Sequence, residues 1–211
     1  MKPAALFDLG RRDYEETLAL QRKRVADRQA GACGDALLLV EHPEVITLGR
    51  RQNSRDNVRS TEIPVVEIER GGDATYHGPG QLVGYPILFL DGEERDLHQF
   101  LRAIEQGLID ACAALGLAAE RKAGFTGVWI GAKKVASIGI AVRRWVTLHG
   151  FALNVSTDLA RFRAILPCGL DPSVMTSLSE ALGREVALAD VKPRVALALG
   201  RALGRSFVGD G

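Results

Sequence analysis

The chain has 211 residues, of which 27 are lysine or arginine and 26 are aspartate or glutamate. A formal net charge of +1 gives no long-range field that would select nucleic acid or an anionic membrane surface as a partner. The length suits a single domain over residues 1–211, large enough to bury a substantial hydrophobic core.

Cysteine usage and apolar runs favour a cytoplasmic protein. Cys33, Cys112 and Cys168 cannot all pair with one another, and none has CxxC spacing. The sequence contains no unbroken apolar run of about 18 residues, and its start lacks an apolar stretch of signal-peptide length. We therefore expect a cytoplasmic location, with no membrane contact, no disulfide framework and no metal site.

The first third of the chain predicts a helix followed by short strands. Asp13 begins a capping-box pattern, and the good helix formers after it predict a helix to about Gln29. Residues 35–49 (DALLLVEHPEVITLG) hold two apolar runs separated at Pro43, and residues 63–72 (IPVVEIERGG) hold a third. Short apolar runs that end in glycine or proline predict strands that lead into loops.

The rest of the chain predicts one amphipathic helix, a group of strands and further helices. Asp96 precedes a run of apolar residues that keep to one helical face. Residues 127–155 are rich in β-branched side chains with glycine at intervals, which predicts consecutive antiparallel strands. Helices are then predicted from Asp158, from Ser177 and from an Asp190 cap.

The order of these elements indicates the fold class. Blocks of strands are separated by helices, without the strict strand-helix-strand alternation of a doubly wound fold. We therefore predict the class α+β (α/β), with a mixed central β-sheet flanked by helices.

A glycine-rich stretch, residues 70–88 (RGGDATYHGPGQLVGYPIL), is the first candidate site. Its last loop glycine is followed by Gln rather than Lys, so it is not a phosphate-binding P-loop, and it does not supply GxGxxG before a helix. Gly71, Gly72, Gly78 and Gly80 are free to adopt positive φ and to leave backbone N–H groups facing a ligand. The alternative is a tight surface turn without a ligand.

Cys168 is the candidate nucleophile, because it stands between a proline and a glycine in AILPCGLD. An ordinary thiol, with a pKa of about 8.5, is mostly protonated at neutral pH and needs a cationic or basic neighbour. His77 and His149 each precede a glycine after a β-prone run, so we expect both at strand ends. Lys133 and Lys134 are adjacent, so on a strand they point to opposite faces and one of them should turn inward.

Three stretches together resemble a known family, the octanoyltransferases of lipoate biosynthesis, also called lipoyl(octanoyl) transferases. They are RGGDATYHGPGQL (70–82), KVASIG with TLHGFALNV (134–155), and FRAILPCGLDPSVMTSL (162–178). The resemblance spans roughly residues 35–185. It implies a catalytic domain like that of biotin and lipoate protein ligases, and an acyltransferase that needs no cofactor.

The resemblance also implies partners. The donor would be octanoyl-acyl carrier protein. The acceptor would be a lysine ε-amine on the lipoyl domains of 2-oxoacid dehydrogenase complexes and on the glycine cleavage H protein. Because acyl carrier protein is acidic as a class, a local basic surface is expected, with Arg143, Arg144 and residues 50–55 as candidates.

Carried over by position, the resemblance implies roles for individual residues. Cys168 takes the place of the nucleophile that forms the acyl thioester, Lys134 that of the lysine that lowers its pKa, and Lys133 becomes the outward neighbour. His149 is a possible accessory residue, and Asp73 falls at a variable position of the motif. The substrate-binding positions are Arg70, Gly71, Gly72, Asp73, Ala74, Thr75, Tyr76, His77, Ser137, Ile138, Gly139, Gly150, Phe151 and Ala152.

Three alternatives stay open from the sequence. An ATP-dependent lipoate or biotin protein ligase shares the implied fold, a Cys-dependent thioesterase would discharge the acyl group to water, and a binding module would not catalyse at all. For a transferase, either Lys134 or His149 is able to accept the proton of the attacking lysine.

Overall fold

The central element of the molecule is a mixed, eight-stranded sheet. The computed structural model describes residues 1–52, 54–60 and 62–209, with the backbone but not the side chain of Cys168. Within these residues the main sheet has the order β11-β1-β2-β6-β10-β9-β8-β7, and a smaller sheet has the order β4-β3-β5. The strands are β1 (Lys2–Arg11), β2 (Ala36–Glu41), β3 (Val45–Leu48), β4 (Val65–Glu67), β5 (Thr75–His77), β6 (Gln81–Ile87), β7 (Glu120–Lys122), β8 (Phe125–Ile130), β9 (Lys133–Arg143), β10 (Val146–Asn154) and β11 (Arg205–Gly209).

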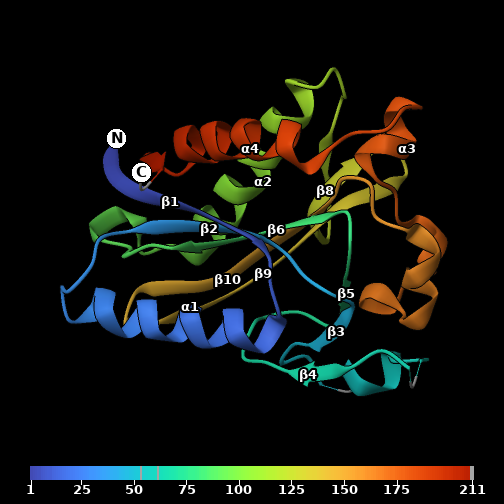
Figure 1. The fold of residues 1–211 in the computed structure, drawn as a ribbon, viewed down its shortest axis with the longest axis horizontal. Coiled ribbons are helices and arrows are strands. Elements are labelled where there is room, and N and C mark those ends of the chain that lie inside the picture. Colours follow the sequence, from blue (N-terminus) through green and yellow to red (C-terminus); the bar gives the residue numbers. More distant parts are fainter. Residues whose placement is uncertain (53, 61, 210–211) are drawn as a thin grey trace.

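Helices cover both faces of the main sheet (Figure 1). The α-helices are α1 (Tyr14–Gln29), α2 (Leu97–Ala113), α3 (Leu178–Leu182) and α4 (Leu188–Ala202). Helices α2 and α4 pack together on one face, and α1 lies on the other. Side chains of β2 alternate between these layers, because Leu37 and Leu39 join the core beneath α2 and α4 while Leu38 and Val40 join the core beneath α1.

The pairing of the strands confirms the predicted fold class. Strand β1 runs parallel to both β2 and β11. The neighbours from β2 through β6, β10, β9 and β8 to β7 are antiparallel. A mixed sheet flanked by helices is therefore present, and its central strands are covered on both faces.

Several predicted boundaries are confirmed by hydrogen bonds at helix starts. The Asp13 carboxylate accepts the N–H groups of Glu15 and Glu16, and α1 ends at Gln29 as predicted. Asp96 caps α2 in the same way. The predicted antiparallel strands after Gly127 are β8, β9 and β10.

The strands at one edge of the main sheet, β11 and β1, were missed by the sequence patterns. Strand β1 has only a short apolar run, residues 4–7, and a single buried side chain, Ala4, so the sequence pattern there is weak. Its partner β11 comes from the other end of the chain, where Arg205 pairs with Lys2. Because each of these strands is stabilised by a partner so far away in the sequence, the residues around it give little indication of a strand.

The predictions for three other segments were wrong in detail. The segment after Asp158 forms a 3₁₀ helix, η3 (Leu159–Ala164), instead of an α-helix. Helix α4 begins at Leu188, so Asp190 lies in its first turn and is not its cap. His149 lies inside β10 rather than at a strand end, with a left-handed φ of 59°.

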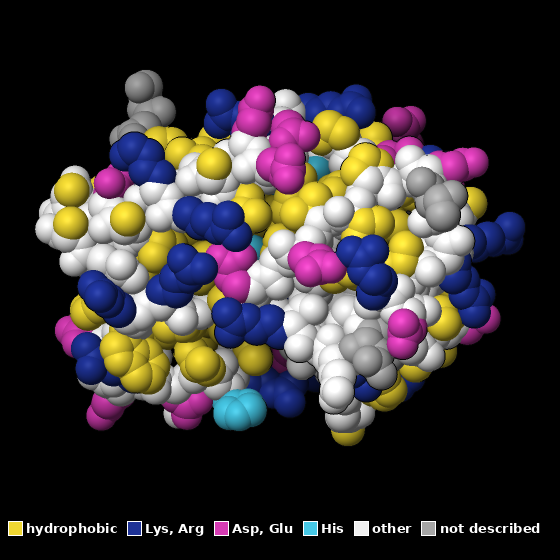
Figure 2. Space-filling model, turned by 90° about the horizontal axis from the view of Figure 1, so that it is seen from below, with side chains coloured by type: hydrophobic (Ala, Val, Ile, Leu, Met, Phe, Trp, Pro, Cys, Tyr) yellow, Lys and Arg dark blue, Asp and Glu magenta, His cyan; other side chains and the backbone are white. Residues whose placement is uncertain are grey.

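A separate apolar cluster holds the small sheet against the segment that contains the predicted nucleophile. Ile46 and Tyr76 from the small sheet pack with Phe162, Ile165 and Met175. This cluster, at the right of Figure 1, sets the 159–175 segment beside the small sheet. The face in Figure 2 shows basic and acidic side chains interspersed, in line with the small net charge. No helix within the described ranges is both long and apolar enough to cross a membrane.

Candidate active site

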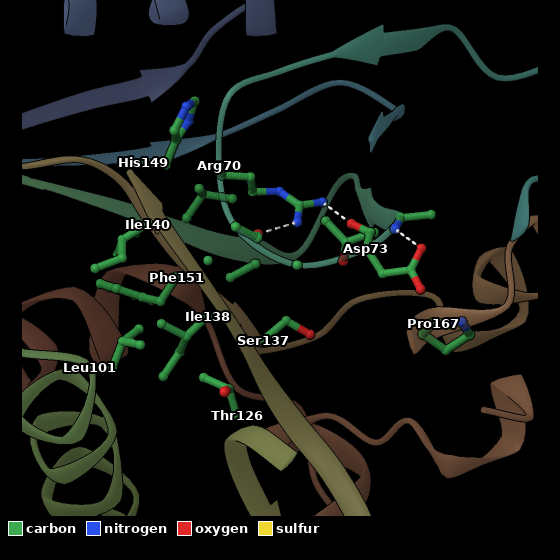
Figure 3. A pocket seen from close by; sticks show the side chains of 18 of the residues that line it. Arg70, Asp73, Leu101, Thr126, Ser137, Ile138, Ile140, His149, Phe151 and Pro167 are labelled. Atoms are coloured by element: carbon green, nitrogen blue, oxygen red, sulfur yellow. Dashed lines mark hydrogen bonds between the residues drawn. The ribbon is translucent and has the colours of Figure 1, made fainter. Parts of the chain in front are cut away.

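A cavity of about 500 Å³ opens between the main sheet, the glycine-rich loop and the turn at Pro167 (Figure 3). This volume falls in the range that is usual for small-molecule sites. Apolar side chains gather at one part of it, namely Leu101, Ile138, Ile140 and Phe151. The cavity therefore offers room for an aliphatic chain next to polar groups of the loop.

Most of the predicted substrate-binding positions line this cavity. They are Arg70, Gly71, Gly72, Asp73, Ala74, Thr75, His77, Ser137, Ile138, Gly139, Gly150, Phe151 and Ala152. Tyr76 is placed elsewhere, because residues along β5 alternate in direction. Its hydroxyl donates to Glu44 Oε1 at 2.9 Å, and its ring packs against Phe162 with the centroids 5.3 Å apart.

The guanidinium of Arg70 holds the glycine-rich loop in shape. It is 8% exposed, and its Nη2 donates to the carbonyl oxygens of Thr47 at 2.9 Å and Asp73 at 2.6 Å. Its Nη1 donates to the carbonyl oxygen of Gly71 at 3.0 Å. Hydrogen bonds from a buried cation to three carbonyls are strong, so this residue acts first as a clamp on the loop.

The glycines allow the loop to approach strand β9 closely. The N–H of Gly71 donates to the Ile140 carbonyl at 2.9 Å, and a Cβ on Gly139 would lie 2.8 Å from the Gly71 oxygen. Gly72 and Gly80 have the predicted positive φ, at 89° and 78°. The N–H of Gly80 is bonded to Glu41 at 2.8 Å. The N–H groups of Gly71 and Gly80 are thus engaged within the protein and do not face a ligand.

Lys134 is the inward member of the lysine pair; the strand pattern predicts that one of the two turns inward, and the family resemblance implies that it is Lys134. It is 4% exposed and lines the cavity, while Lys133 lies on the surface and pairs with Glu180 at 2.7 Å. The Lys134 Nζ lies 5.9 Å from the centroid of the Trp129 ring, within the range of a cation–π contact. The register between β8 and β9 shifts between Val128 and Trp129, where Trp129 pairs with Lys134.

Gly127 and Glu105 support the Lys134 side chain from β8 and α2. Gly127 has a φ of 131°, and a Cβ there would lie 2.6 Å from Lys134 Cε. Its N–H donates to Glu105 Oε1 at 3.0 Å. Glu105 is 1% exposed and forms ion pairs with Arg102 at 2.7 Å and Arg121 at 3.1 Å. Neither residue belongs to a motif, so sequence reasoning missed both.

The predicted nucleophile stands in a short 3₁₀ turn, η4 (Pro167–Gly169). Pro167 lines the cavity, and it lies at the side of the cavity opposite His149 in Figure 3. The Cys168 side chain lies outside the described residues, so its contacts stay a prediction. A backbone hydrogen bond holds the residue just before this turn against another segment, since the Leu166 N–H donates to the Asn57 carbonyl at 2.8 Å.

His77 is buried in a polar network beneath the cavity. Its Nδ1 lies 2.8 Å from Gln81 Oε1, and the amide of Gln81 donates to Asn154 Oδ1 at 3.0 Å. The ring stacks on Tyr14 with the centroids 5.7 Å apart. Burial, together with nearby His42, lowers the pKa of His77 to about 3, so it is neutral at pH 7.

His149 is also buried and neutral, but its surroundings differ. Burial lowers its pKa to about 4 against the opposing effect of Glu69, whose carboxylate oxygen lies 3.6 Å from its Nε2. Neither ring nitrogen has a hydrogen-bond partner among the described residues. Within the same residues, no group of three or more His, Cys, Asp or Glu side chains is arranged to hold a metal ion.

The candidate basic surface is largely paired within the chain. Arg143 contacts Glu69 at 3.0 Å, Arg55 contacts Glu67 at 2.8 Å, and Arg51 lies 3.5 Å from Asp73. Residue 53 of the 50–55 segment lies outside the described residues. The cavity wall also contains residues that no motif pointed to, among them Tyr14, Leu101, Phe125 and Thr126.

Comparisons with known proteins agree with this fold. The lipoyl protein ligase A/B catalytic domain matches residues 13–200. An octanoyltransferase of Geobacter metallireducens is 53% identical over 189 residues, which is 90% of this chain and 88% of that protein. Among solved structures, lipoate-protein ligase A bound with ATP superposes with a TM-score of 0.82 at 19% identity, covering 100% of this chain and 89% of the other.

A more distant fold relative is the biotin protein ligase of Aquifex aeolicus, with a TM-score of 0.56 at 14% identity, covering 97% of this chain and 70% of the other. Fold and cavity thus define a catalytic domain of the lipoate and biotin protein ligase type. The chain belongs to the lipoyl protein ligase A/B catalytic domain family, and within it to the octanoyltransferases. It is an acyltransferase that acts in protein lipoylation.

Proposed function

We propose that the enzyme moves an octanoyl group from octanoyl-acyl carrier protein to a lysine ε-amine on lipoyl domains, through a thioester on Cys168. The acceptors would be the lipoyl domains of 2-oxoacid dehydrogenase complexes and the glycine cleavage H protein. The observation that supports this is the buried Lys134 on the wall of a partly apolar cavity to which the Cys168 turn contributes Pro167. Residues 1–211 would act as one catalytic domain.

The first half-reaction is an exchange between two thioesters. Lys134 favours the thiolate of Cys168, either as a neighbouring cation or by taking its proton. The thiolate attacks the octanoyl carbonyl, the new C–S bond forms, and the bond to the carrier-protein thiol breaks. That thiol leaves with a proton. Because one thioester replaces another, the step requires no ATP.

The second half-reaction is attack by the acceptor lysine on the acyl-enzyme. The ε-amine must lose a proton, the amide bond forms, and the Cys168 thiolate leaves. We assign the proton to Lys134 rather than to His149 because of their separation. In the β9–β10 register His149 pairs with Ile140, which is six residues from Lys134 and so about 20 Å along the strand.

The test of this mechanism compares the two neighbouring lysines. Wild-type enzyme mixed with octanoyl-acyl carrier protein should gain one octanoyl mass on Cys168 in a mass spectrum. Lys134→Ala should slow formation of that adduct on the order of 100-fold or more. Lys133→Ala is the matched control and should keep the wild-type rate, because Lys133 lies on the surface. Absence of the adduct from wild-type enzyme would refute the Cys168 mechanism.

An ATP-dependent ligase is the second candidate, because lipoate-protein ligase A shares this fold. Such an enzyme activates free octanoate as an acyl-adenylate and has no use for a nucleophilic cysteine. Octanoylation of a lipoyl domain from octanoyl-carrier protein without ATP would decide for the transferase. A requirement for ATP and free octanoate would decide for the ligase, and release of octanoate to water would decide for a thioesterase.

We further propose a cytoplasmic location. Cys33 and Cys112 are free thiols among the described residues, and unpaired cysteines are typical of a reducing compartment. Burial raises the pKa of the Cys112 thiol to about 12, so it behaves as a small apolar side chain. Cell fractionation with an antibody against the chain would test this location.

A further inference from the structure

We infer that Asn57 and Asp73 are a positioning pair that sets the Cys168 turn against the acyl cavity. The two side chains join segments that are distant in sequence. Asp73 belongs to the glycine-rich loop that forms one wall of the cavity, and Asn57 ends a 3₁₀ helix, η1 (Ser54–Asn57). The inference rests on the proposed role of Cys168 as the nucleophile.

The Asp73 side of the pair is built into the cavity wall. Asp73 is 4% exposed, and its Oδ1 accepts the N–H of Ala74 at 2.7 Å. Its backbone carbonyl accepts Arg70 Nη2 at 2.6 Å. Arg51, at 3.5 Å, partly balances its charge. The Asp73 carboxylate is therefore fixed relative to the loop that lines the cavity.

The side-chain amide of Asn57, at the end of η1, forms hydrogen bonds with the Asp73 carboxylate. Its Nδ2 donates to both carboxylate oxygens of Asp73, at 2.8 Å and 2.9 Å. A hydrogen bond to an ionised acceptor is stronger than one between neutral groups. The pair thus fixes the end of η1 to the cavity wall.

From Asn57 the chain leads directly to the Cys168 turn. The Asn57 carbonyl accepts the N–H of Leu166 at 2.8 Å, two residues before Cys168. Val58 forms a β-bridge with Ile165, and the N–H of Arg59 donates to the Ala164 carbonyl at 2.8 Å. Residues 57–59 are in this way paired with residues 164–166. One side-chain pair consequently links the loop wall of the cavity to the turn that carries Cys168.

This arrangement predicts an effect on rate more than on binding. A misplacement of about 1 Å between reacting groups is able to cost on the order of 100-fold in rate. Asn57→Ala removes both hydrogen bonds to the carboxylate, so we expect Cys168 acylation at saturating donor to slow by about 10- to 100-fold. The donor KM should change little, since the cavity walls stay in place. Asp56→Ala, in the same turn but exposed, is the matched control and should react at the wild-type rate.

The side chains of residues 57 and 73 can be exchanged, so that position 57 carries the carboxylate and position 73 the amide. This exchange tests whether the hydrogen-bonded pair itself sets the acylation rate or whether the single variants only disturb the fold. Asn57→Asp alone sets two carboxylates against each other and should slow acylation most. Adding Asp73→Asn restores one amide and one carboxylate, and the amide oxygen introduced at position 73 still accepts the Ala74 N–H. We expect the double variant to recover to within a few-fold of wild type. Thermal unfolding would be recorded for every variant.

The results have distinct meanings. Slow acylation in Asn57→Ala and Asn57→Asp, with recovery in the double variant, supports the positioning pair. A wild-type acylation rate in folded Asn57→Ala, or a double variant as slow as Asn57→Asp, overturns it while leaving the Cys168 mechanism intact. If wild-type enzyme acquires no octanoyl group on Cys168, the proposed function fails and this inference fails with it.

Discussion

The two walls of the cavity are held in place by different forces. The wall formed by β9 and β10 belongs to a regular antiparallel ladder, in which Gly139 pairs with Gly150 and Ile138 with Phe151. The opposite wall, the loop from residue 70 to residue 74, combines backbone hydrogen bonds to neighbouring segments with side-chain hydrogen bonds from Arg70 and Asn57. Substitutions in the first wall should therefore act through packing, and those in the second through lost hydrogen bonds.

The largest effect on stability is expected from Gly150→Ala in the ladder wall. An added Cβ would lie 2.1 Å from the Gly84 carbonyl oxygen and 2.7 Å from Pro86 Cδ, in a neighbouring strand that has no freedom to yield. The free energy of unfolding should fall by about 3 kcal/mol or more. Denaturant titration would measure it. Gly34→Ala is the control, because an added Cβ there meets nothing within 4 Å, and equal stability of both variants would contradict the packing argument.

Arg70→Lys in the loop wall is expected to lower the free energy of unfolding somewhat less than Gly150→Ala does. It should also slow the acylation of Cys168. A single ammonium lacks the fork that reaches the carbonyls of Thr47, Gly71 and Asp73. The free energy of unfolding should fall by about 1.5–3 kcal/mol, and acylation should slow as the loop loosens. Arg201→Lys, on the exposed side of α4, should change neither quantity. Retention of full activity by Arg70→Lys would show that the loop keeps its shape without the clamp.

The pH dependence of stability compares one histidine from each wall. Both are neutral in the folded protein, with pKa values of about 3 for His77 and about 4 for His149, below the ordinary 6.5. The folded state thus binds fewer protons than the unfolded state below pH 6.5, and stability present above pH 6.5 is lost as the pH falls toward these values. Each residue should contribute a slope of about 1.4 kcal/mol per pH unit between pH 6 and pH 4.5.

Unfolding titrations of His149→Asn would measure this slope, since asparagine tolerates the left-handed φ of residue 149. The variant should show a shallower fall in stability than wild type over that interval. His98→Asn, an exposed position, should leave the slope unchanged. An unchanged slope in His149→Asn would mean that His149 is already protonated in the folded state.

The smallest effect is expected from Ile138→Val at the apolar part of the cavity. Removal of one methylene enlarges the space for the acyl chain and removes about 0.8 kcal/mol of contact. The ratio of kcat/KM for decanoyl over octanoyl donors should rise by about fourfold. Leu197→Val, which is on the surface of α4 and 59% exposed, provides the control. A ratio that does not change would place the end of the acyl chain elsewhere in the cavity.

Local sequence signals predicted the features that local forces decide. Caps at Asp13, Asp96 and Ser177 were identified because a side-chain oxygen bonds to N–H groups two or three residues ahead. Strand alternation predicted that one of Lys133 and Lys134 points inward, and the structure shows that it is Lys134. These signals need no knowledge of distant partners.

Features that depend on distant partners left no such signal. Glu105 supports Gly127 across 22 positions, and Asn57 meets Asp73 across 16. The direction of Tyr76 away from the cavity depends on where β5 joins the small sheet. The sequence alone also indicated no separation between His149 and Lys134, which the β9–β10 register places about 20 Å apart along the strand.

The sequence by itself determined the fold class, the helix caps and the motifs that carry the family resemblance, because periodicity, capping and motif spacing are properties of neighbouring residues. Only the tertiary structure decided which motif residues share one cavity, how the glycine-rich loop is clamped by Arg70, and how Asn57 and Asp73 connect that loop to the Cys168 turn. Such contacts arise when the chain folds back on itself, and their geometry depends on the packing of the whole sheet and its helices.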